Sequence, residues 1–153
     1  MQRLELKIPP LLLTFLFSFF IWIVSLITNE ININKWVVYS LSFFPFIGGS
    51  FFCVAGVIGF RNAKTTVNPL KPDKASSLVD SGIYRISRNP MYVGLFLLLI
   101  SWTFILKNFY SFVAALLFVP YMNQFQIKPE ERALEKIFGA SYIEYKNRVH
   151  RWI

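Results

Sequence analysis

The chain has 153 residues, enough for one domain, and 55% of them are hydrophobic. Its mean hydropathy of +0.48 excludes an ordinary soluble domain. The formal net charge of +8 is compatible with nucleic-acid binding, but the basic residues form no RNA- or DNA-binding motif, so we expect no nucleic-acid partner. One cysteine and one histidine, far apart in the chain, exclude a disulfide framework and leave no pattern of metal ligands.

Four long runs without a charged residue follow one another along the chain. A bilayer core is crossed by roughly 20 helical residues, and each run approaches or exceeds this length. Lipid satisfies no backbone hydrogen bond, and the runs lack the alternation of barrel strands, so we expect helices. The sequence therefore predicts an all-α, polytopic membrane protein with transmembrane helices at about 9–27, 36–60, 90–106 and 109–127.

Small residues are frequent in the second of these helices, among them Gly48, Gly49, Gly56 and Gly59. Small residues let the backbones of two membrane helices approach closely. We therefore expect the second helix to be the central, packed helix of the bundle.

Basic residues predict the orientation of these helices. Of the 16 Lys and Arg residues, all but Lys35 and Lys107 lie before the first helix, between the second and third, or after the fourth. Because basic residues concentrate on the cytoplasmic side of a membrane, both termini and the 61–89 loop are expected to be cytoplasmic.

The segment after the fourth run has a different pattern. Apolar residues recur there at steps of three and four, and Pro129 suits the first turn of a helix. This predicts an amphipathic helix at 129–148, lying at the cytoplasmic membrane surface, with Gly139 as the point where it bends or splits.

The sequence SRNPMYVG, residues 87–94, marks the start of the third helix. Asn89 is a suitable N-cap and Pro90 a suitable first helical residue. The free N–H groups of this helix end, together with Arg88, can hold an anion. The simpler interpretation is that Arg88 contacts lipid headgroups and Tyr92 belongs to the aromatic belt of the membrane surface, and the residues alone leave both open.

Glu130 and Glu131 directly follow the fourth run. Acidic residues in the first turn of a helix complement its dipole, which explains them without a ligand. A tight connection between the third and fourth helices, however, also brings this pair beside Arg88. A ligand held there would meet a cation on one side and a carboxylate on the other, which suits a zwitterion such as an amino-acid group.

The ordered segments LVDSGIYRISRNPMYVG, EE and FGASYIEYKNRV resemble the isoprenylcysteine carboxyl methyltransferase and phospholipid methyltransferase superfamily. These are integral membrane enzymes that use S-adenosylmethionine, and the resemblance covers about residues 65–153. It implies S-adenosylmethionine as the cofactor. The cofactor-binding residues that it implies are Ser76, Ser77, Leu78, Val79, Tyr84, Asn89, Pro90, Met91, Tyr92 and Glu130.

Two positions depart from the family pattern. The usual histidine of the third-helix motif is Asn89, which cannot titrate near neutral pH. In the prenylcysteine enzymes an arginine four residues before the pocket glutamate is thought to face the substrate carboxylate, and that position is Gln126, which has no charge. We assign no catalytic residue, and Arg88, Gln126 and Glu131 are candidates for positioning the reactants.

The resemblance implies methyl transfer at the cytoplasmic face to a small or lipophilic acceptor, with membrane lipid as a further partner. The acceptor is a prenylcysteine-like carboxylate, a thiol or a phospholipid amine. The alternative is a non-catalytic membrane scaffold or an inactive relative of the family. A transporter is disfavoured because no predicted span contains an interior charge.

Overall fold

A computed structural model describes residues 5–63 and 77–153, and these ranges contain helices and no strand. The all-α prediction is therefore confirmed for the described part of the chain. A 3-10 turn covers Gly82–Arg85 and a π-helical segment covers Asn123–Ile127. The α-helices are α1 (Pro10–Ile27), α2 (Lys35–Asn62), α3 (Pro90–Ile105), α4 (Phe109–Leu116), α5 (Phe118–Met122), α6 (Lys128–Phe138) and α7 (Ala140–Arg148).

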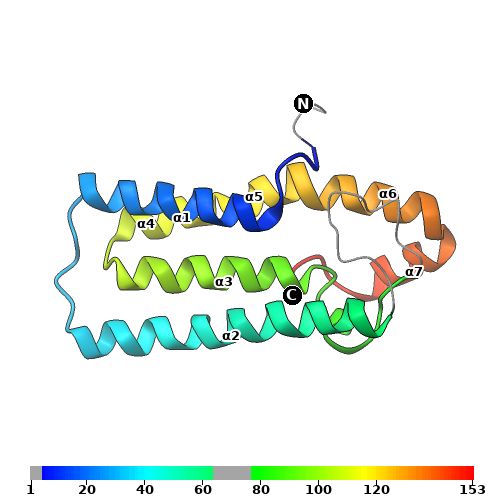
Figure 1. Ribbon diagram of the computed structural model, residues 1–153, viewed down its shortest axis with the longest axis horizontal. Coiled ribbons are helices and arrows are strands. Elements are labelled where there is room, and N and C mark those ends of the chain that lie inside the picture. The colour runs from blue at the N-terminus through cyan, green and yellow to red at the C-terminus, as the bar shows by residue number, and fades with distance from the viewer. Residues whose placement is uncertain (1–4, 64–76) are drawn as a thin grey trace.

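The central helix of the bundle is α3. It lies between α2 on one side and α1 with α4 on the other (Figure 1). The prediction that the second helix is central is wrong: most of the surface of α2 is exposed, and α2 packs along α3. Gly49 of α2 serves the contact with α3, because a Cβ atom added there would lie only 2.8 Å from the carbonyl oxygen of Gly94, while Gly59 packs against Tyr84.

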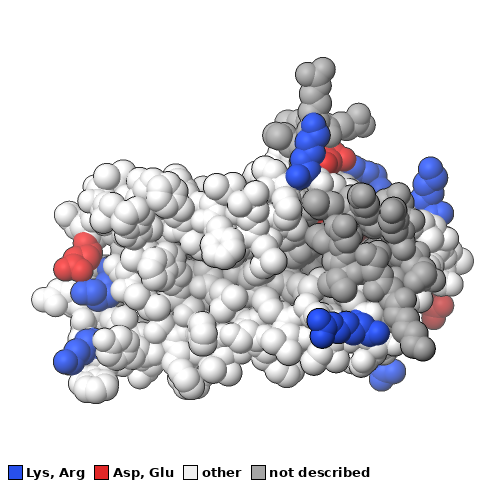
Figure 2. Space-filling view, in the orientation of Figure 1, with Lys and Arg blue, Asp and Glu red and all other residues white. Residues whose placement is uncertain are grey.

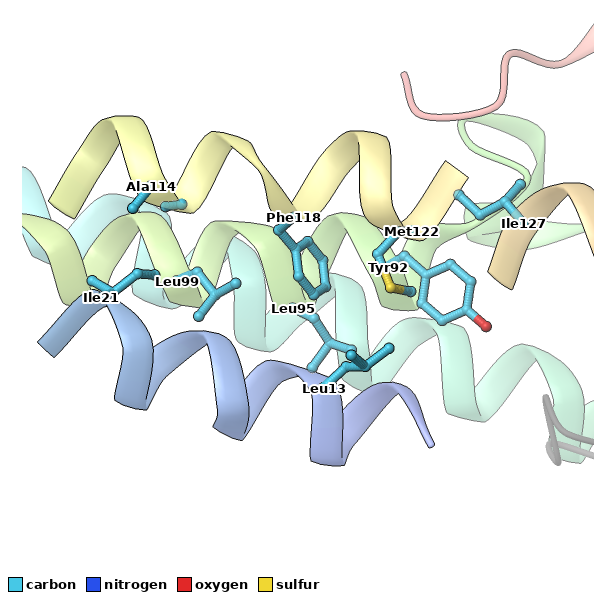
Figure 3. Packing of buried hydrophobic residues seen from close by; sticks show 10 residues of the cluster. Leu13, Ile21, Tyr92, Leu95, Leu99, Ala114, Phe118, Met122 and Ile127 are labelled. Atoms are coloured by element: carbon cyan, nitrogen blue, oxygen red, sulfur yellow. The ribbon is translucent and has the colours of Figure 1, made fainter. Parts of the chain in front are cut away.

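An apolar core joins α3 to the helices on its other side. Leu13 and Ile21 of α1, Leu99 of α3 and Phe118 of α5 are buried together, and the Phe118 side chain points toward Leu95 of α3 (Figure 3). Tyr92 lies at the end of this cluster, with its hydroxyl group directed away from it (Figure 3). The apolar core thus ends at the hydroxyl group of Tyr92.

Two helices, α1 and α2, are long and apolar enough to cross a membrane by length and composition, and α3 is a shorter apolar helix. Large apolar side chains are exposed along α1 and α2. The face in Figure 2 carries its charged side chains at the two ends of the bundle, and the part between them is uncharged. This distribution is typical of a protein whose middle lies in lipid.

The predicted helix at 109–127 is divided into α4, α5 and the π-helical segment. Pro120 has no N–H group, so it cannot donate to the carbonyl of Leu116, and α4 ends at that residue. At the start of α4, the side chain of Asn108 caps the helix by accepting from the N–H of Ser111 at 2.9 Å.

The predicted helix at 129–148 is likewise two helices, α6 and α7. They are separated by Gly139, whose φ of +51° lies in the left-handed region that glycine adopts readily. Pro129 is in the first turn of α6, as the sequence indicates. The position of both helices at a membrane surface stays a prediction.

Candidate active site

Asn89 occupies the N-cap position of α3, but its side chain does not cap the helix. Its Nδ2 donates instead to the carbonyl oxygen of Arg151 at 2.9 Å, and its backbone N–H donates to Oγ of Ser87 at 3.0 Å. The predicted side-chain cap is therefore wrong, because the amide holds the C-terminal end of the chain against the start of α3.

Tyr92 and Glu130 form a hydrogen-bonded pair between α3 and α6. Tyr92 is 5% exposed, and its hydroxyl group donates to Oε1 of Glu130. The pKa of Glu130 is raised to about 8, mainly by burial; the hydrogen bond from Tyr92 lowers it, and the charge of Glu131 adds to the rise. Near neutral pH, Glu130 therefore favours either a bound proton or a neighbouring cation.

Glu131 lies between two arginines. The side chains of Arg88 and Glu131 are each 9% exposed, and Nη1 of Arg88 lies 3.1 Å from Oε1 of Glu131. Arg151 donates through Nε to Oε1 at 3.0 Å and through Nη2 to Oε2 at 2.6 Å. These hydrogen bonds raise the pKa of Arg151, so it stays charged. Among the described residues no acceptor has hydrogen-bond geometry to Nε or Nη1 of Arg88.

The two glutamates have different partners. The structure brings the starts of α3 and α6 together, but Arg88 pairs with Glu131, while Glu130 faces Tyr92. Adjacent residues of a helix point about 100° apart, so only one of the two glutamates can face Arg88. The burial of Arg88 and Tyr92 does not fit contact with headgroups or membership of an aromatic belt.

The predicted cofactor residues before α3 pack against α2. The hydroxyl of Ser77 donates to the carbonyl of Ala63 at 2.8 Å, and that of Tyr84 donates to the carbonyl of Gly56 at 3.3 Å. Val79 is buried with Tyr84, and Leu78 packs against the same cluster. Burial raises the pKa of Tyr84 well above its usual value, so this phenol stays neutral.

The other predicted residues are placed as follows. Ser76 lies outside the described residues. Pro90 is buried, and Met91 packs tightly against α2, because a Cβ atom added at Gly56 would lie 2.5 Å from Cγ of Met91. Met91 thus fills the contact between α2 and α3 beside the charged cluster.

Gln126 is 1% exposed and lies in the π-helical segment, one turn before Glu130. Its Nε2 donates to the carbonyl of Ile8 at 2.8 Å, while its Oε1 has no hydrogen-bond partner in the described part of the chain. Gln126 therefore ties the segment before α1 to the end of the fourth run, and it leaves one buried acceptor open.

The C-terminal segment, residues 149–153, is the part of this site that sequence reasoning missed. The carbonyl of His150 accepts from the N–H of Arg88 at 3.0 Å, and the indole of Trp152 donates to Oδ1 of Asn123 at 3.0 Å. No local spacing indicates these contacts, since they join residues far apart in sequence. The only signal is a basic and an aromatic residue at the end of an otherwise amphipathic stretch.

A bundle with an uncharged middle on the face in Figure 2 and an ionic cluster at one end is typical of a membrane protein. The model of the phospholipid methyltransferase family matches residues 11–141, and the chain belongs to this family.

Three relatives illustrate the similarity. An uncharacterised protein of Haemophilus influenzae is 43% identical over 63 residues, which are 41% of this chain and the whole of the relative. Protein-S-isoprenylcysteine O-methyltransferase of Saccharomyces cerevisiae is 37% identical over 79 residues, 52% of this chain and 33% of the relative. Protein-S-isoprenylcysteine O-methyltransferase B of Arabidopsis thaliana is 26% identical over 116 residues, 76% of this chain and 59% of the relative.

The matched part thus spans a third of the yeast relative and somewhat more than half of the plant one. No solved structure matches the chain significantly.

Proposed function

We propose that the chain is an S-adenosylmethionine-dependent methyltransferase of the membrane, which methylates a lipophilic acceptor at the cytoplasmic face. The observation that carries this proposal is the largely buried cluster of Arg88, Tyr92, Glu130 and Glu131 where the apolar core ends. Membership of the phospholipid methyltransferase family and similarity to isoprenylcysteine methyltransferases support the reaction class.

The residues present fit the charges of the proposed cofactor. S-adenosylmethionine ends in an amino-acid group with a carboxylate and an ammonium, next to a sulfonium. Arg88 has buried donors without an acceptor among the described residues, which suits the carboxylate. Glu130 has a pKa raised to about 8, so a neighbouring cation stabilises its ionised form.

Bound S-adenosylmethionine supplies an electrophilic methyl group and a neutral thioether as leaving group. The chain therefore needs no acid to assist departure, and its task is to hold the reactants in line and exclude water. Tyr92 fixes the orientation of Glu130 through its hydrogen bond, and the packed contact between α2 and α3 excludes water from one side.

The acceptor in this proposal reaches the site from the bilayer, through the apolar part of the bundle. A carboxylate or a thiolate attacks without a base, whereas a phospholipid amine first loses a proton. In this proposal the chain crosses the membrane four times with both termini in the cytoplasm. The distribution of basic residues supports this orientation, in which the cluster lies on the cytoplasmic side.

Calorimetry with S-adenosylmethionine and the purified protein tests the proposal. We expect wild type to bind and Glu130→Ala to bind at least roughly tenfold more weakly, because truncating a buried charged partner costs several kcal/mol. Glu144→Ala, which changes an exposed glutamate of α7, is the matched control and keeps wild-type affinity. A folded wild-type protein that binds no S-adenosylmethionine in detergent or in lipid would refute the proposal.

A further inference from the structure

We propose that Arg151 is a positioning residue, which holds Glu131 by two hydrogen bonds and thereby leaves donors of Arg88 available to an anionic group of the ligand. This inference rests on the proposed function and deepens it. It assigns a role to the C-terminal segment, whose contacts connect the start of α3 with α6 and with the π-helical segment.

The two arginines do not share Glu131 equally. Arg151 donates two hydrogen bonds, one to each carboxylate oxygen, at 3.0 and 2.6 Å. This fork-to-fork arrangement is the geometry in which a guanidinium binds a carboxylate most strongly. Arg88 approaches one oxygen through Nη1 at 3.1 Å, without the angle of a hydrogen bond. Arg151 therefore holds Glu131 by two hydrogen bonds, whereas Arg88 forms an ion pair with one of its oxygens and donates no hydrogen bond to it through Nη1.

The side chains around Glu131 therefore carry more positive than negative charge. One carboxylate lies between two guanidinium groups, and the guanidinium with the more buried side chain is that of Arg88. In the part of the chain that the structure describes, Nε and Nη1 of Arg88 find no hydrogen-bond acceptor. Buried charged donors require an acceptor, and a carboxylate or phosphate oxygen is the group that fits them best.

Backbone contacts set Arg151 in this place independently of its side chain. Its carbonyl accepts from Nδ2 of Asn89 at 2.9 Å, and the preceding carbonyl, of His150, accepts from the N–H of Arg88 at 3.0 Å. A substitution of the Arg151 side chain keeps both hydrogen bonds. It removes only the two hydrogen bonds that Arg151 donates to Glu131, so Glu131 is then available to accept hydrogen bonds from Arg88.

The experiment compares S-adenosylmethionine binding by full-length wild type, Arg151→Ala, Glu131→Gln and the double variant, by calorimetry. Arg151→Ala should weaken binding by at least roughly tenfold, because Glu131 then competes with the ligand for the donors of Arg88. The double variant should recover affinity to within about threefold of wild type, because a neutral amide competes weakly for Arg88. Arg148→Ala, which loses a surface ion pair with Asp80 at 3.2 Å, is the matched control and binds as wild type does.

The outcomes separate this inference from the proposed function. If wild type binds and Arg151→Ala binds equally well, or if the double variant binds as weakly as Arg151→Ala, then Arg151 is not a positioning residue, although the proposed function stands. If wild type itself does not bind, the proposed function fails. Glu131→Gln alone completes the cycle, so that the coupling between Arg151 and Glu131 follows from the four affinities.

Discussion

The affinity of the protein for S-adenosylmethionine should depend on pH through the ionisation of Glu130. Burial raises its pKa to about 8, so at neutral pH the side chain is mostly protonated before any ligand binds. In the proposed complex, the cationic end of S-adenosylmethionine lies beside Glu130 and requires the carboxylate form. Binding therefore releases a proton, and affinity rises as the pH rises toward and through 8.

The size of the effect follows from the fraction ionised. With a pKa of about 8, about a tenth of Glu130 is ionised at pH 7 and about nine tenths at pH 9. Affinity for the cation should therefore increase about tenfold between these pH values. Tyr92→Phe removes the hydrogen bond that lowers the pKa of Glu130, so its affinity profile should move to higher pH.

Calorimetry at pH 7 in buffers of different ionisation enthalpy measures the proton release directly. Wild type should release about 0.9 proton on binding, in proportion to the protonated fraction. Glu130→Gln, measured with the same ligand, subtracts any titration of the ligand itself. An affinity that changes with pH equally in wild type and Glu130→Gln would refute the assignment of Glu130 to the cation.

Two further substitutions test the packing. Gly94→Ala should destabilise the protein by roughly 1–3 kcal/mol, because the added Cβ atom would lie 2.5 Å from Sγ of Cys53 and 2.6 Å from the carbonyl oxygen of Gly49. Gly48→Ala is its control, with a nearest contact of 3.6 Å, and an equal loss of thermal stability in both would contradict the packing argument. Asn108→Ala should cost about 1–3 kcal/mol, because its buried side chain caps α4 and bonds to the end of α1; an unchanged unfolding midpoint would show that neither bond matters.

The helices were predictable from the sequence because a run of apolar residues has few alternatives in lipid. The apolar runs did not predict where the helices are interrupted or how the helices are arranged in space. Pro120 ends α4 within a run that hydropathy alone shows as continuous. The small residues of α2 indicated a close contact, but Gly49 packs against Gly94 of the neighbouring helix, and it is that neighbour which is central.

The candidate site was predictable as a region, while its individual contacts were not. The tight connection between the third and fourth predicted helices placed Arg88 near a pair of glutamates, but the choice of Glu131 over Glu130 depends on the rotation of α6 about its axis. Asn89 has the residue type of a cap, yet tertiary contact with the backbone of Arg151 determines its orientation. Such contacts, between residues more than 60 positions apart, leave no periodic signal in a single sequence.

The position of α3 between the other helices has a consequence for how sequences of this kind can change over time. Residues of α3 meet neighbours on several sides, so an exchange there alters more than one contact at once. Most side chains of α1 and α2 face outward, where one bulky apolar residue replaces another at little cost. Divergence should therefore accumulate in α1 and on the outer face of α2, and distant relatives should remain recognisable by α3 and the residues that lead into it.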